Sequence, residues 1–280
     1  MSPHAEINTP VEALTACVHP EDEKVYHARA GDFMSSHQLR DFRRCPELFR
    51  RQRAGLVPKP DKPAYLVGRA AHSLIIEGRV EFDRRYMTGG PINPKTNRPY
   101  GADTKAHADW ASQQDREVLT GEQMYAVERM ADAVARHDLA SRLFSGGIGE
   151  GVARANYGGV PCQIRIDYLH PAHGIVDLKT CDEMDWFESD ARKYGYIHQL
   201  AFYRGVLAMA AGGVPPATIP CHLVAVEKSE PFRCGVWLVT PALLDDLDNQ
   251  NLAALDEFGS CEITGIWPTR FEECRTFYAV

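Results

Sequence analysis

Two acidic residues and a lysine stand close together in the middle of the chain, at positions that could build a metal site. Asp167 lies near the end of one short β-like run and Asp177 near the end of the next, and the turn-forming residues 170–174 separate the two runs. Side chains alternate along a strand, so Asp177 and Lys179 share one face. Two carboxylates and an ammonium group on one side of a hairpin suit metal-dependent phosphodiester hydrolysis, because Mg²⁺ takes oxygen ligands and a cation can act on the attacking water or the phosphate.

The Asp-x-Lys motif by itself is weak evidence, because in many surface strands it forms only a solvated ion pair. Here an expected helix follows it, in which Gln199 and Tyr203 are spaced four residues apart and therefore share a face. The glutamine could hydrogen-bond the attacking water, an oxygen of the scissile strand or the loop of Asp177, and the tyrosine could reach a phosphate. Tyr196 and His198 are expected to point elsewhere on the helix.

This order of residues resembles the PD-(D/E)XK nuclease superfamily, and within it the RecE- and RecB-type exonucleases, including phage exodeoxyribonuclease VIII-like proteins. The resemblance covers roughly residues 34 to 270, and it implies an α/β fold with a restriction-endonuclease-like core, in which helices flank a central mixed sheet. It also implies Mg²⁺, with Mn²⁺ as a substitute. Its catalytic residues would be Asp167, Asp177, Lys179, Gln199 and Tyr203. The second acid departs mildly from the family pattern, which more often has glutamate.

The resemblance also assigns the metal ligands, which would be Asp167, Asp177, the carbonyl group of Leu178, His72 and Glu150. Gly68 and His72 are one turn apart on an expected helix, so a close backbone approach and an imidazole coincide. A lone histidine on an apolar helix is more often a core residue, and the downstream motif is what favours a ligand. Glu150 begins the first strand of the expected meander, where an edge glutamate facing solvent is nearly as good an interpretation.

A basic segment on an otherwise acidic protein predicts where DNA would lie. The formal net charge is −7, which argues against a surface covered with nucleic-acid contacts. Between residues 40 and 69, however, basic residues outnumber acids. The residues expected to contact DNA are Arg43, Arg44, Arg51, Arg69 and, beside the first acid, Arg165, which could instead neutralise the carboxylates. The alternative for about half of the segment, which also includes Lys59 and Lys62, is a solvated helix face.

The elements that must position these residues fit one α/β domain. The 280 residues suffice for one sizeable core. We expect a loosely held arm over residues 1–30 and a nuclease domain over 31–280, with a helical insertion over about 90–147. Ser35 or Ser36 should cap a helix, Pro46 should open another, and a capping box from Thr120 to Gln123 should open a helix that ends at residues 145–147. Further expected elements are an exposed loop (91–101), a helix (185–211) broken at Gly195, two strands (219–226 and 232–239) and a helix (241–258).

The eight cysteines are scattered without a C-x-x-C motif, so neither a zinc site nor a disulfide framework is indicated. Some RecB-like nucleases hold an iron–sulfur cluster, but the spacing of Cys45, Cys261 and Cys274 does not match, and no cluster is expected. The sequence lacks an apolar run of about 18 residues and a secretory pattern, which favours a cytoplasmic protein without membrane contact.

The function expected from these features is exonucleolytic cleavage of duplex DNA ends, in phage-type recombination or repair. The partners implied by the resemblance are DNA ends, a single-strand annealing protein and further copies of the chain in a homo-oligomer. A structure-selective or single-strand endonuclease would share every site residue. A DNA-binding protein without catalysis is disfavoured, because the expected acids and the lysine are all present.

Overall fold

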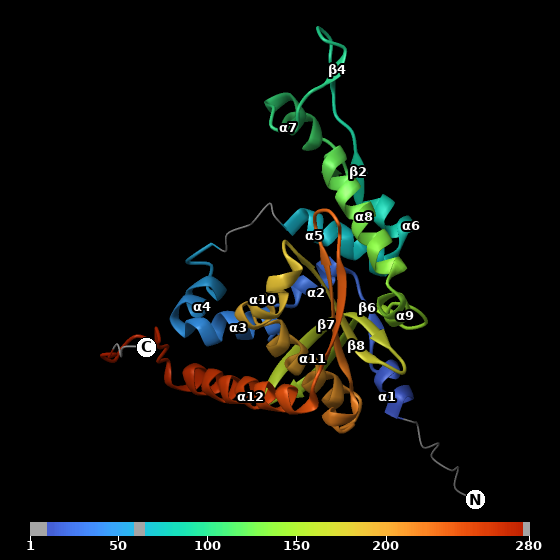
Figure 1. Cartoon of the computed structure of the whole chain (residues 1–280). Helices are drawn as coiled ribbons and strands as arrows, with labels where there is room; N and C mark the ends of the chain where they lie inside the picture. The colour runs from blue at the N-terminus through green and yellow to red at the C-terminus, as the bar shows by residue number, and fades with distance from the viewer. Residues whose placement is uncertain (1–9, 59–64, 277–280) are drawn as a thin grey trace, which may run out of the picture.

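The computed structural model describes residues 10–58 and 65–276, and a six-stranded mixed sheet lies at its centre (Figure 1). The strands, in spatial order, are β1 (His19–Pro20), β6 (Ile148–Tyr157), β7 (Val160–His170), β8 (Gly174–Cys181), β9 (Cys221–Glu227) and β10 (Cys234–Val239). Strands β6, β7 and β8 form an antiparallel meander, whereas β8 and β9 are parallel. Helices flank the sheet, so the predicted fold class is confirmed.

Glycines make both tight turns of the meander. Gly158 and Gly159 have positive φ angles of 58° and 78° and join β6 to β7, as predicted. Gly174 begins β8 with a φ of 69°, and a β-carbon there would lie 2.2 Å from the carbonyl oxygen of Pro220. Only glycine therefore fits between the start of β8 and the residue that precedes β9.

One face of the sheet is covered by helices from both ends of the chain. These helices are α3 (Ser36–Arg44), α4 (Pro46–Arg53), α10 (Phe187–Tyr194), α11 (Tyr196–Ala210) and α12 (Pro241–Thr264), with short 3-10 turns at Met184–Trp186 and Pro216–Thr218. Ser35 caps α3 in a capping box with Gln38, and Pro46 is the first residue of α4, as the sequence predicts. Gly195 separates α10 from α11 in the left-handed conformation, which confirms the predicted break.

The other face is covered by the helices that carry His72 and by the long helix after Thr120. They are α5 (Tyr65–His72), a π-helical turn (Ser73–Glu77), α6 (Arg79–Arg85), α8 (Gly121–Arg136) and α9 (Asp138–Leu143). The capping box from Thr120 to Gln123 is present. The prediction of one continuous helix that ends at residues 145–147 is wrong, because His137 ends α8 and its side chain caps α9.

The predicted insertion over about 90–147 consists of two different parts. Strands β2 (Tyr86–Thr88) and β5 (Glu117–Leu119) pair in parallel, and the chain between them projects away from the body (Figure 1). That projection contains the small pairing of β3 (Ile92–Asn93) with β4 (Arg98–Pro99) and helix α7 (Lys105–Ala111). Helices α8 and α9, in contrast, bury Val127, Met130 and Leu143 in the main body.

Residues 10–30 do not form the loosely held arm that was predicted. They contain α1 (Pro10–Ala16) and α2 (Glu23–Ala28), while β1 pairs with β6 at the sheet edge. Leu14, Val18 and Tyr26 are buried. Helices this short show little periodicity in the sequence, so only their packing reveals them. Residues 1–9 lie outside the described part of the chain.

Within the described residues, none of the helices combines the length and the apolar character that crossing a bilayer requires.

Candidate active site

The two predicted acids lie where β7 and β8 separate. The strands pair from His170↔Gly174 to Tyr168↔Val176, and the next position in this register would set Asp167 opposite Asp177. The ladder stops there. Oδ2 of Asp167 instead accepts a hydrogen bond of 2.8 Å from the backbone N–H of Leu178. The side chain of one acid thus replaces a backbone partner, which keeps the strands apart and the two carboxylates together.

Asp177 is completely buried and poorly satisfied. Lys179 Nζ lies 2.5 Å from Asp177 Oδ2 as an ion pair, and no other donor reaches either carboxylate oxygen among the described residues. Burial raises the pKa of Asp177 to about 6, although the charge of Lys179 opposes the rise. Burial raises the pKa of Asp167 as well. A buried carboxylate with unused lone pairs is a ligand that fits a divalent cation.

Glu150 joins these acids from the neighbouring strand. The pairs Gly149↔Tyr168 and Gly151↔Ile166 set Glu150 opposite Asp167 in the register of β6 and β7. Its φ angle is 52°, a left-handed conformation that costs a non-glycine residue free energy and that is often found at functional sites. Burial, and next the charge of Asp167, raise the pKa of Glu150 to about 7, although Arg165 Nε donates to it at 2.6 Å.

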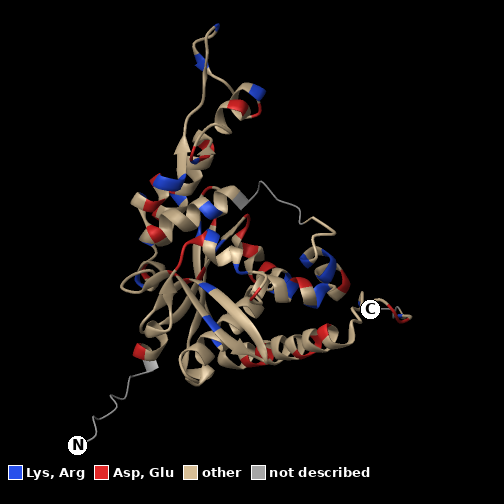
Figure 2. Ribbon diagram, turned by 180° about the vertical axis from the view of Figure 1, so that it is seen from behind, with Lys and Arg blue, Asp and Glu red and all other residues tan. Residues whose placement is uncertain are grey.

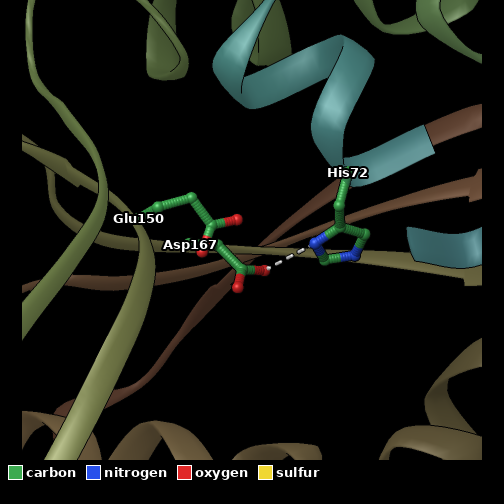
Figure 3. Close-up of side chains that lie close together, drawn as sticks. All are labelled: His72, Glu150 and Asp167. Carbon is green, nitrogen blue, oxygen red and sulfur yellow. Dashed lines mark ion pairs between the residues drawn. The ribbon is translucent and has the colours of Figure 1, made fainter. Parts of the chain in front are cut away.

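His72, the last residue of helix α5, completes the cluster (Figure 3). Its Nδ1 lies 3.5 Å from Asp167 Oδ2, and single ligand atoms of His72, Glu150 and Asp167 all lie within 4.8 Å of one another. Burial, assisted by the charge of Lys179, lowers the pKa of His72 to about 4, although Asp177 and a hydrogen bond with the Leu178 backbone oppose this. The imidazole is therefore neutral at pH 7, which is the form that ligates metals.

Gln199 and Tyr203 share a face of α11, as predicted, and bond each other. Gln199 Nε2 donates to the Tyr203 hydroxyl at 2.9 Å. Tyr203 is buried, and burial raises its pKa well above the ordinary value. A buried, protonated hydroxyl engaged by the glutamine is not offered to a phosphate, so its position favours a role in holding Gln199.

Tyr196 is the residue that sequence reasoning missed. The amino group of Lys179 lies 4.9 Å from the centre of the Tyr196 ring, so the expectation that Tyr196 points away from the site is wrong. The signal was present in the sequence. Tyr196, Gln199 and Tyr203 are spaced i, i+3 and i+7, which places all three on one face of a helix.

Comparison with known proteins agrees with this geometry. The family described as "PDDEXK-like domain of unknown function (DUF3799)" matches residues 35–279, which is most of the chain. The chain belongs to this family. It is therefore a member of the PD-(D/E)XK nuclease superfamily, as the order of its acids, lysine and glutamine predicted.

Solved structures extend the comparison. The crystal structure of a candidate exonuclease from Eubacterium rectale matches with a TM-score of 0.67 and 17% identity, over 94% of this chain and 96% of that chain, which shows a shared fold. The crystal structure of LHK-Exo in complex with dAMP matches over 71% of this chain and 93% of that chain, with 13% identity. Its TM-score of 0.29 is too low to show a shared fold. A search among curated proteins finds no match.

The predicted DNA-binding arginines of this PDDEXK-like chain do not form one patch. Arg44 and Arg51 are exposed on α3 and α4 without an ion-pair partner among the described residues, and Arg43 donates to the Asn251 side chain at 2.9 Å. Figure 2 shows Lys and Arg positions distributed over several elements of the chain. Arg69 lies on α5 and pairs with Glu117 at 2.8 Å. Arg165 pairs with Glu150, as described above. Lys59 and Lys62 lie outside the described residues.

A cavity of about 100 Å³ lies beside Lys179, between α3 and the start of α11. Lys179 and Gln199 reach its wall from the candidate site, and Arg40 and Arg43 reach it from α3. Burial lowers the pKa of Arg43, and the nearby charge of Arg40 contributes. Three cationic side chains, Arg40, Arg43 and Lys179, therefore line this cavity, which suits an anionic ligand.

Proposed function

We propose that this chain is a metal-dependent DNA exonuclease that hydrolyses phosphodiester bonds at duplex ends. The observation that carries the proposal is the convergence of Asp167, Glu150 and neutral His72, whose ligand atoms lie within 4.8 Å of one another, next to the ion pair of Asp177 and Lys179 where β7 and β8 separate. Membership in the PD-(D/E)XK superfamily supports nuclease chemistry, and the convergence supplies the residues for it.

The residues present fit a divalent metal, because an imidazole nitrogen and two carboxylate oxygens, from His72, Glu150 and Asp167, lie within 4.8 Å of one another. Asp167, Asp177, Glu150, His72 and the Leu178 carbonyl group would hold Mg²⁺, or Mn²⁺ in its place. The bound ion would supply Lewis-acid stabilisation of the phosphate charge and a more acidic water.

The remaining polar groups would act on water and substrate. Lys179 is fixed at the edge of the site by Asp177, where its ammonium group can orient the attacking water or stabilise negative charge on the phosphate. Gln199 reaches the same cavity and is held by Tyr203, so its carbonyl oxygen remains available to accept a hydrogen bond from that water. Lys179 and Gln199 are each held by a neighbouring side chain, which favours catalysis by preorganisation.

The path proposed for DNA enters along α3 and α4. Arg43 reaches the cavity beside Lys179, and the exposed Arg44 and Arg51 lie on the same two helices, so a phosphate backbone could follow them into the site. Arg69 and Arg165 would join only by exchanging their carboxylate partners for phosphate.

The biological setting proposed here rests on the resemblance to RecE-type exonucleases. We place the protein in phage-type recombination or repair in the cytoplasm, as a homo-oligomer that works with a single-strand annealing protein. A structure-selective or single-strand endonuclease is the second candidate, since it would use the same acids and lysine.

Digestion of end-labelled linear, nicked and closed circular DNA tests the proposal. We expect Mg²⁺-dependent loss of linear duplex alone, and no cleavage by Asp177→Asn. The Lys179→Ala variant should lose ~10²- to 10⁴-fold in rate while it still binds Mg²⁺ in calorimetry. Cleavage of closed circles would favour the endonuclease. Binding without cleavage, or full activity of Asp177→Asn, would overturn the assignment.

A further inference from the structure

The ammonium group of Lys179 has two neighbours of different kinds. Asp177 Oδ2 lies 2.5 Å from Nζ, and the centre of the Tyr196 ring lies 4.9 Å from it. The first contact is an ion pair and the second a cation–π contact, in which the negative face of the ring attracts the cation. Lysine has a long flexible side chain, so one contact alone would leave its direction poorly defined.

The Tyr196 ring is itself held in place. Gly195, with a φ of 77°, ends α10 and makes Tyr196 the first residue of α11. The ring then lies 5.9 Å from the Tyr194 ring and 6.4 Å from the Phe187 ring, and Phe187 packs on Trp237 at 4.6 Å. This cluster of tilted aromatic rings connects β10 and α10 to the position of the ammonium group.

The ring face, and not the hydroxyl group, makes the contact. No hydrogen bond of the Tyr196 hydroxyl is found within residues 10–58 and 65–276, so removal of its oxygen atom should leave the surroundings unchanged. Phenylalanine would keep the ring face, whereas leucine would remove it and keep apolar volume.

We propose that Tyr196 is a positioning residue that holds Lys179 for catalysis once metal is bound. The inference rests on the nuclease function proposed above. A carboxylate that ligates a cation shares its charge, so Asp177 would attract the lysine less when the metal is present. The Tyr196 ring carries no charge and no ligand atom for Mg²⁺, and its attraction for the ammonium group therefore persists in the loaded site.

The test compares Tyr196→Phe with Tyr196→Leu, and Tyr125→Leu serves as a matched control because that tyrosine is exposed on α8. We expect Tyr196→Leu to lower kcat by about 2- to 30-fold, the rate equivalent of a cation–π contact, with little change in KM or in Mg²⁺ affinity. The phenylalanine variant and the control should keep wild-type kcat. In a Lys179→Ala background, Tyr196→Leu should have no further effect, because the group it positions is absent.

Spectroscopy separates this inference from the proposed function. A ring face above the Lys179 side chain shifts its terminal CH₂ protons upfield, which can be followed with ¹³C-labelled lysine and assigned with Lys179→Arg. We expect the shift in the wild type and in Tyr196→Phe, and its loss in Tyr196→Leu; if that variant does not fold, Tyr196→Met replaces it.

The possible outcomes distinguish the two claims. An inactive wild type would overturn the function, and with it the positioning role. An active wild type would leave the function standing, but the role of Tyr196 would be overturned by an unchanged Tyr196→Leu, by an equal loss in Tyr196→Phe, or by additive losses with Lys179→Ala.

Discussion

Buried carboxylates with too few donors are the chemical feature that sets the candidate site apart. Burial of a carboxylate is costly unless hydrogen bonds or cations compensate it, and Asp177 has only the ammonium group of Lys179. Glu150 adds a third acid in a left-handed conformation. The fold therefore carries both charge repulsion and backbone strain at this point, and a bound cation would relieve the repulsion.

The pKa of Glu150 predicts how the metal-free protein responds to pH. Its folded-state pKa is about 7, above the ordinary 4.5 of a glutamate, so between these values the folded chain binds a proton that the unfolded chain does not. The contribution of Glu150 to the free energy of unfolding should consequently increase as the pH falls from about 7 to 4.5. Urea unfolding in EDTA at pH 7.5 and 5.5 tests this. The wild type should gain stability relative to Glu150→Gln on acidification, and parallel behaviour of the two proteins would contradict the assignment.

The backbone of Glu150 predicts an unusual ranking of two substitutions. In a strand, glycine is ordinarily ~0.5–1 kcal/mol less stable than alanine. At a φ of 52° the order should reverse, because the left-handed conformation costs a residue with a β-carbon ~1–2 kcal/mol. We expect Glu150→Gly to unfold at a higher urea concentration than Glu150→Ala, while both bind Mg²⁺ more weakly than the wild type. Greater stability of the alanine variant would show that the strand relaxes.

At the scale of elements, the hairpin from β7 to β8 and the approach of α5 bring the site together. Gly174 sets where β8 begins and hence which residue of β7 faces Asp177. On the other side of the sheet, a β-carbon on Gly68 would lie 3.3 Å from Thr180 Oγ1, so glycine lets α5 approach β8 closely. The close approach of α5 places His72 next to Asp167.

Two hairpin glycines provide a matched comparison. Gly159 and Gly174 both have left-handed φ angles, 78° and 69°, but a β-carbon on Gly159 meets nothing within 4 Å, whereas one on Gly174 collides with the backbone of Pro220. Gly159→Ala should therefore cost only the conformational ~1–2 kcal/mol. Gly174→Ala should cost a further ~1–3 kcal/mol for the collision and should also weaken Mg²⁺ binding, because β8 must shift. Thermal unfolding and calorimetry of both variants test this, and equal losses would show that β8 accommodates the collision.

At the scale of the whole molecule, the distribution of charge matters more than its sum. The chain has a net charge of −7, and several of its arginines are paired with acids, as Arg154 with Glu21 and Arg204 with Asp245. Arg44 and Arg51 are exposed without such partners among the described residues. Exposed arginines without a carboxylate partner leave local positive charge on α3 and α4, where the proposed path for DNA begins.

Replacement of Arg43, Arg44 and Arg51 by glutamine should weaken DNA binding in a salt-dependent manner. Each lost phosphate contact lowers the slope of log affinity against log salt concentration by ~0.9 for duplex DNA, so the slope should fall by roughly 2 to 3. Binding is measured with Ca²⁺ or without metal, which prevents cleavage. A control with Arg84, Arg136 and Arg142 replaced, all exposed on the opposite helices, should keep the slope. If the first variant also keeps it, the DNA path lies elsewhere.

The sequence by itself indicated the candidate site residues and most of the local structure. Strand and helix periods are local properties, so Asp177 and Lys179 two residues apart, Gln199 and Tyr203 four apart, and the caps at Ser35 and Thr120 could be read before any fold was known. The superfamily followed from the same spacing. The glycines of the hairpin turn could also be predicted from the sequence, since few other residues adopt the left-handed conformation that such a turn requires.

Only the tertiary structure decided which side chains meet across elements. The left-handed conformation of Glu150, its pairing with Arg165 and the contact of Tyr196 with Lys179 depend on register and burial, which elements distant in sequence establish together. The folding of residues 10–30 is of the same kind, because two short helices and a two-residue strand gain stability only from the sheet edge that they cover. The local backbone sets which side chains of one helix or strand share a face, whereas packing sets which residues of other elements they contact.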